Sequence, residues 1–164
     1  MKRNLVISFA CVIIMIIVMR ILGHSLVTPV SARGIIDLEF ARTEGRLNQL
    51  RVFWNPSDIN NNIYVDFVFI AAYGWFFVTA CLFIKSRTNW SKWSNSFSAL
   101  ALSAAFFDVC ENFLMLLVLN GRFNASVLQI VFYCALIKFV LIGCVVLFIL
   151  GSLPFALTKK QRQR

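Results

Sequence analysis

Residues 97–119 read FSALALSAAFFDVCENFLMLLVL, an apolar run that carries three strongly polar side chains close together. Side chains three and four positions apart share one face of a helix, so Asp108, Glu111 and Asn112 point in the same direction. Ionisable groups inside a bilayer are costly, and by default they mark a site. This stretch therefore predicts a transmembrane helix with a polar site on one face.

The composition of the whole chain is typical of a membrane protein. Of its 164 residues, 60% are hydrophobic and only 14% are charged, whereas soluble domains carry about a quarter charged residues. Several spanning helices leave no room for a separate soluble domain, so we expect one membrane domain over residues 1–164. The formal charge of +9 comes from basic residues at the two ends and in one short loop. That distribution fits membrane topology and a lipid environment, and it argues against a nucleic-acid partner.

Four apolar runs predict the transmembrane helices, at about residues 5–22, 63–84, 97–119 and 127–153. Each is near the length of about 20 residues that a span needs. A cleaved signal peptide would begin like the first run, but the nearest cleavage motif, Val30-Ser31-Ala32, lies well beyond it, so we expect this helix to be retained. The predicted fold class is all-α: a polytopic four-transmembrane-helix bundle with a short amphipathic helix in the first exoplasmic loop.

The distribution of Lys and Arg predicts the orientation in the membrane. Basic residues gather near the N-terminus, in the turn at 85–95 and in the tail at 158–164, while the loop 23–62 carries four charges of each sign. Positively charged loops stay in the cytoplasm, and neutral ones are usually exported. Both termini are therefore expected in the cytoplasm, with 23–62 and 120–126 outside.

Within the exoplasmic loop, a short helix is expected from Thr43, a plausible N-cap, to about Trp54, where Asn55-Pro56 would end it. One face of this helix is apolar, so it would lie on the membrane surface or cover the bundle. The apolar positions are Leu47, Leu50, Phe53 and Trp54.

The segment 34–40, ahead of that helix, alternates apolar and acidic residues. It is open to two interpretations. An extended or re-entrant piece would carry Asp37 and Glu39 towards the membrane, whereas an ordinary loop would leave both carboxylates in water.

Polar side chains of three helices converge on the outer half of the predicted bundle. Asp66 lies near the outer end of the second span, and Tyr73 follows two turns later on the same face. Lys138 is on the order of 16 Å down the fourth span at 1.5 Å per residue. We therefore predict an outward-opening buried acidic pocket. Its expected ligand-binding residues are Asp66, Tyr73, Asp108, Glu111, Asn112, Lys138, Asp37 and Glu39.

Lys138 has a structural interpretation as well, because buried charges are normally paired. It would then neutralise Asp108 or Glu111 and fix the helix register. With Asp66 included, there are three intramembrane carboxylates and one lysine. An ion pair with Lys138 therefore leaves at least one acid that is protonated or that binds a cation or a polar ligand.

Three functions fit such a site. The first is binding of a lipid-like or cationic amphiphilic ligand. The second is acid/base chemistry on a lipid, with Asp66, Asp108 and Glu111 as candidate catalytic groups. The third is a small proton- or cation-coupled transporter, for which a homo-oligomer would supply the pathway. No cofactor is expected, and no metal site, because the single histidine does not make one and the five cysteines fit small hydrophobes.

The chain resembles a set of uncharacterised four-helix bacterial integral membrane proteins. The resemblance spans nearly the whole chain and rests on Asp37-Leu38-Glu39-Phe40-Ala41 together with Asp108-x-x-Glu111-Asn112. It implies a bacterial inner (plasma) membrane location and brings no activity. A fainter likeness, in architecture alone, is to the sterol-isomerase and sigma-2-receptor group, which binds sterol-like or cationic amphiphiles. Such a likeness does not establish function, and the His and Trp pattern of the isomerases is missing here.

Overall fold

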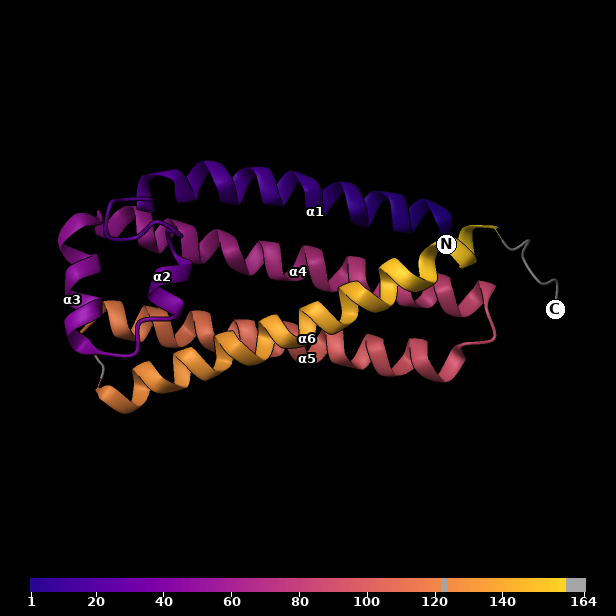
Figure 1. Ribbon diagram of the computed structural model, residues 1–164. Coiled ribbons are helices and arrows are strands. Elements are labelled where there is room, and N and C mark those ends of the chain that lie inside the picture. The colour runs from indigo at the N-terminus through magenta and orange to yellow at the C-terminus, as the bar shows by residue number, and fades with distance from the viewer. Residues whose placement is uncertain (122–123, 159–164) are drawn as a thin grey trace.

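Four long helices form the body of the protein in the computed structural model, which describes residues 1–121 and 124–158 (Figure 1). They are α1 (Lys2–Gly23), α4 (Pro56–Arg87), α5 (Ser91–Leu119) and α6 (Ala125–Thr158). Each is long and apolar enough to cross a membrane, by length and composition. The predicted all-α class with four spanning helices is confirmed.

The helices are longer than the apolar runs that predicted them, because polar residues continue them at their ends. In α4, Asn55 is the N-cap and its side-chain oxygen accepts a hydrogen bond from the backbone of Ser57, with Pro56 in the first turn. These capping groups satisfy backbone donors that would otherwise have no partner. Most of the basic tail predicted at 158–164 lies outside the described residues.

α4 is the central helix of the bundle. It packs against α1, α5 and α6, and α5 and α6 also pack against each other. Small side chains bring α4 and α5 close, since a Cβ placed on Gly74 would lie 3.8 Å from the Cβ of Ala105. Phe97 of α5 stacks on Phe148 of α6 with ring centroids 4.1 Å apart. Close backbone approach through small residues is the usual way in which helices pack within a membrane.

Three short elements cover one end of the bundle, which we call the capped end: η1 (His24–Leu26), α2 (Ile36–Glu39) and α3 (Glu44–Phe53) (Figure 1). As expected for an N-cap, the Thr43 hydroxyl accepts a hydrogen bond from the backbone of Arg46. Of the predicted apolar face, Leu47, Leu50 and Trp54 are buried, but Phe53 is 54% exposed. That α3 is an amphipathic helix lying on a membrane stays a prediction.

The segment 34–40 is not extended. It forms the single helical turn α2, which the chain enters through Gly34 at φ +61°, a conformation that favours glycine. Asp37 and Glu39 are 7% and 6% exposed. The interpretation of these two residues as solvated loop acids is therefore wrong, because the one-turn helix packs its side chains against the bundle.

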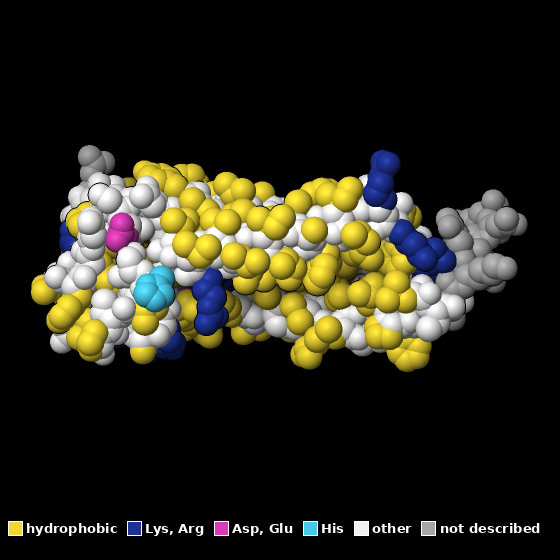
Figure 2. Space-filling view, turned by 90° about the horizontal axis from the view of Figure 1, so that it is seen from above, with side chains coloured by type: hydrophobic (Ala, Val, Ile, Leu, Met, Phe, Trp, Pro, Cys, Tyr) yellow, Lys and Arg dark blue, Asp and Glu magenta, His cyan; other side chains and the backbone are white. Residues whose placement is uncertain are grey.

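Charge is divided unevenly between the two ends of the molecule. Figure 2 shows hydrophobic side chains spread along the length of one face, with charged side chains gathered towards its ends. All seven acidic residues lie in the half that bears the cap. The opposite end, which we call the basic end, holds Lys2, Arg3, Lys85, Arg87 and Lys92. The basic residues on which the predicted orientation rests thus lie together at one end of the bundle. The orientation in the membrane stays a prediction.

Candidate functional site: a buried acidic cluster

Lys138 of α6 is the centre of a group of buried charges beneath the cap. Its Nζ donates a hydrogen bond to Asp108 Oδ1 at 2.7 Å and lies 2.9 Å from Glu111 Oε2. The same nitrogen lies 3.4 Å from Glu39 Oε1 of α2. All four side chains are nearly inaccessible to solvent, and Glu111 is completely so. One ammonium group on α6 thus contacts three carboxylates, two from α5 and one from α2.

Two further hydrogen bonds join α4 to this group. Tyr73 OH donates to Asp108 Oδ2 at 2.8 Å, and Asn112 Nδ2 donates to Asp66 Oδ2 at 2.7 Å. Asp108 is thereby held on both oxygens, by Tyr73 on one side and by Lys138 on the other. We call the whole set the buried acidic cluster: Glu39, Asp66, Tyr73, Asp108, Glu111, Asn112 and Lys138.

Helical spacing explains how α5 supplies three members of the cluster. Asp108, Glu111 and Asn112 share one face of α5, as their positions predict. In the bundle that face turns towards α4 and α6, since Asn112 reaches Asp66 while Asp108 reaches Lys138. The predicted structural ion pair of Lys138 is present, and it involves both candidate acids together.

The cluster holds more negative groups than Lys138 can balance. It has four carboxyl groups, on Glu39, Asp66, Asp108 and Glu111, and one ammonium group. Several of its buried oxygens also have no hydrogen-bond partner among the described residues: Glu39 Oε2, Glu111 Oε1 and Asn112 Oδ1, with Asn62 Oδ1 one turn before Asp66. Buried polar atoms are normally hydrogen-bonded. All four of these atoms are acceptors, so the site lacks donors.

α2 closes the cluster from above. Besides the contact of Glu39 with Lys138, Phe40 packs on two aromatic rings of α6, those of Phe132 and Phe139, at centroid distances of 5.6 and 6.0 Å. The Lys138 ammonium lies 5.1 Å from the ring centre of Phe139. The polar groups therefore have an aromatic wall beside them on the α6 side.

Asp37 is the one predicted site residue that does not join the cluster. Its carboxylate accepts hydrogen bonds from the backbone and guanidinium of Arg33, and it lies 3.6 Å from Arg46 Nη2. Arg46 in turn donates to the backbone carbonyl of Val30. These contacts tie α2 to α3, so Asp37 stabilises the cap rather than lining the cluster.

Two residues at this site, Asn62 and Phe40, were not predicted from the sequence. Asn62 is only 1% exposed and precedes Asp66 by one turn of α4, a spacing that was visible in the sequence. Phe40 lies directly after the acidic pair and was visible only as an apolar position. Its partners on α6 are more than 90 residues away in the chain, so no local pattern indicated them.

Glu39 lies outside the spanning helices, and its titration provides a test of the site. Burial raises the pKa of its carboxyl above the ordinary value of 4.5, Lys138 opposes the rise, and Asp108 adds to it. The folded protein then binds this proton more tightly than the unfolded chain, so the stability from the protonated group is lost as the pH rises from about 4.5 through the raised pKa. In Glu39→Gln, which cannot ionise, we expect a smaller fall in unfolding temperature over that range.

Glu44→Gln is the matched control, because Glu44 is an exposed acid of α3 in the same cap. Its unfolding temperature should follow the wild-type curve over the whole pH series. If Glu39→Gln has the same pH dependence as wild type, the burial of Glu39 has no energetic consequence.

The fold and this geometry define a class: a helical bundle of membrane-spanning type with a buried, acid-rich polar cluster under a cap. Comparison of the chain with protein-family models, curated proteins and solved structures gives no match. Both resemblances noted from the sequence stay predictions.

Proposed function

We propose that the buried acidic cluster binds the cationic headgroup of an amphiphile. The observation that carries this proposal is the imbalance within the site, which holds four carboxyl groups and one lysine. Lys138 contacts three of them, and among the described residues Asp66 is bonded only to Asn112. Charges buried in a medium of low dielectric must be paired or neutralised. A ligand with a positive charge would supply the additional positive charge that the carboxylates need and that Lys138 alone does not provide.

The unpartnered atoms indicate the chemistry of that ligand. An alkylammonium group carries several N–H donors, as the lysine side chain does. Glu111 Oε1, Glu39 Oε2 and Asn112 Oδ1 are acceptors without a donor among the described residues. In the described part of the chain, no group of three or more His, Cys, Asp or Glu side chains is placed to hold a metal ion. This arrangement favours an organic ammonium ion over a metal ion.

The surroundings of the cluster suit an apolar tail. Aromatic rings flank the polar groups on both sides, with Phe139 beside Lys138, and Phe69 and Phe77 packed on Tyr73 at 5.5 and 5.6 Å. A ligand must displace α2 to enter from the capped end. Moving α2 would break the Glu39–Lys138 ion pair. At 3.4 Å this is the longest of the three ion pairs that Lys138 makes.

The two alternatives have less support. A transporter needs polar groups that continue towards the basic end, but there the Ser98 hydroxyl of α5 bonds back to the carbonyl of Ser94 in its own helix. An enzyme acting on a lipid needs a reactive partner for the acids. Lys138 is the basic group closest to these acids, and it is already paired with three carboxylates.

The test compares two probes with the same alkyl chain, the cation dodecylamine and the neutral alcohol dodecanol. The measurement is thermal unfolding of the purified protein in a neutral detergent. We expect dodecylamine to raise the unfolding temperature of the wild type, because a ligand that binds only the folded state stabilises it. Dodecanol, which carries no positive charge, should raise it much less. In Glu111→Gln the affinity for dodecylamine should fall at least about tenfold, since hydrogen bonds to charged groups contribute about 1.5–3 kcal/mol.

Glu44→Gln, which removes an exposed acid outside the cluster, should bind dodecylamine as the wild type does. The proposal fails if both probes stabilise the protein equally, because binding would then depend on the alkyl chain alone. It fails as well if Glu111→Gln and Glu44→Gln bind the amine with equal affinity.

A further inference from the structure

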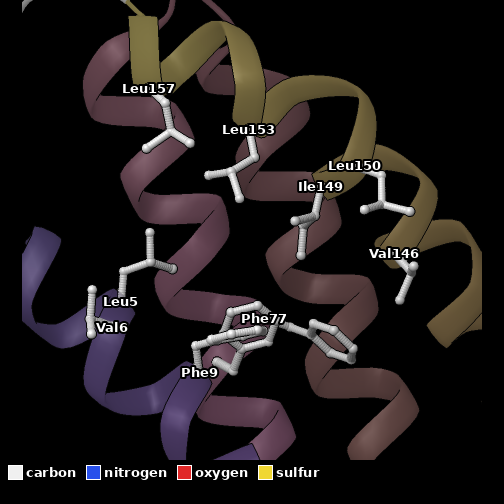
Figure 3. A pocket seen from close by; sticks show the side chains of 10 residues that line it. Leu5, Val6, Phe9, Phe77, Val146, Ile149, Leu150, Leu153 and Leu157 are labelled. Carbon is white, nitrogen blue, oxygen red and sulfur yellow. The ribbon is translucent and has the colours of Figure 1, made fainter. Parts of the chain in front are cut away.

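A wholly apolar groove lies between α1, α4 and α6, on the basic-end side of the buried acidic cluster. Its volume is about 400 Å³, within the range of about 300–1,000 Å³ that is usual for small-molecule sites. Figure 3 shows its side chains converging from three helices. They include Leu5 and Val6 of α1, Phe77 of α4, and Leu150 and Leu153 of α6.

The groove exists because α1 and α6 lie on either side of α4 at this end (Figure 3). Several of its side chains remain open to the surroundings, with Val6 65% and Leu150 66% exposed. Ordered water needs polar partners, which this lining does not offer. Left empty, the lining would lose the dispersion contacts that a neighbouring hydrocarbon provides. The occupant that fits the groove is therefore an alkyl chain.

Basic residues of a helix that lines the groove indicate what headgroup that chain carries. Lys2 and Arg3 lie three positions before the groove residues Leu5 and Val6 in α1, and thus on the same helix face, and both are exposed. All seven acidic residues of the chain lie in the opposite half. Trp90 lies at this end as well, packed against Phe155 of α6 with ring centroids 6.1 Å apart. Tryptophans mark the level of lipid headgroups, and clusters of Lys and Arg there attract anionic lipids.

We propose that this groove binds one acyl chain of an anionic phospholipid, with the lipid phosphate beside Lys2 and Arg3. The site is distinct from the proposed cation site, since none of the charged residues of the buried acidic cluster lines the groove; Phe77, which packs on Tyr73, lies between the two. The apolar groove binds the acyl chain of the lipid, and Lys2 and Arg3 favour a negatively charged headgroup.

The experiment is native mass spectrometry of the protein released from bilayers of mixed phosphatidylglycerol and phosphatidylcholine. Wild type should retain phosphatidylglycerol in preference to phosphatidylcholine. Leu150→Trp, which fills the groove, should lower retention of both lipids several-fold. Leu147→Trp is the matched control, because Leu147 is 72% exposed on the same helix and does not line the groove. It should retain lipid as the wild type does.

The headgroup is tested by Lys2→Gln and Arg3→Gln, which leave the groove intact. Each should reduce the preference for phosphatidylglycerol about fivefold while phosphatidylcholine is still retained, since a basic residue near an anionic surface contributes about 1 kcal/mol. Val6→Trp fills the groove from its opposite wall and should repeat the effect of Leu150→Trp. Equal lipid loss from Leu150→Trp and Leu147→Trp, or no headgroup preference in the wild type, would overturn the proposal.

Discussion

Lys138→Met should lower the free energy of unfolding by about 3–5 kcal/mol, the usual result of removing one partner from a buried ion pair. Methionine keeps much of the length and volume of lysine but has no charge. Asp108, Glu111 and Glu39 would then lose the one ammonium group that contacts all three. The measurement is reversible unfolding in mixed detergent micelles at neutral pH.

Lys92→Met is the control for this prediction, because Lys92 is an exposed lysine at the basic end, in the first turn of α5. It should change stability by less than about 0.5 kcal/mol, as surface substitutions generally do. Combining Lys138→Met with Asp108→Asn should cost less than the sum of the two single changes, because the two residues interact directly. If Lys138→Met is as stable as Lys92→Met, the lysine does not neutralise the cluster.

Leu50→Ala should open the cap over the buried acidic cluster. Leu50 of α3 is completely buried and packs in an apolar cluster with Leu38 of α2, Ile63 of α4 and Val118 of α5. Truncating a buried leucine to alanine costs about 2–5 kcal/mol. The loss of stability should be confined to the cap, because α4, α5 and α6 keep their contacts with one another. Hydrogen exchange in residues 36–53 should accelerate while the middle of α4 and α5 stays protected.

Val52→Ala provides the comparison, since Val52 lies two positions away on the same helix and is 80% exposed. Exchange in that variant should match the wild type. Uniform acceleration across all helices of Leu50→Ala would show that the cap and the bundle unfold as one unit. The cap would then be unsuited to act as a separately moving cover.

The sequence alone determined the features that depend on neighbours along the chain. Runs of apolar residues long enough to span a bilayer predicted all four long helices, because a helix in hydrocarbon must satisfy its backbone groups within itself. The spacing of Asp108, Glu111 and Asn112 placed them on one face, since helical periodicity is local. The Thr43 cap predicted the start of α3 for the same reason.

The tertiary structure alone decided how the charged groups pair. Asp37 and Glu39 are two residues apart in the same acidic segment, yet Glu39 contacts Lys138 while Asp37 pairs with Arg33 and Arg46. Tyr73 was expected on the same face as Asp66, but that its hydroxyl donates to Asp108 on the neighbouring helix appears only in the structure. Which side chains meet across helices depends on the rotation and separation of those helices, which are set by the packing of the whole bundle. The spacing of residues along the chain predicts the helix face on which a side chain lies. It does not predict which residue of another helix that side chain will contact.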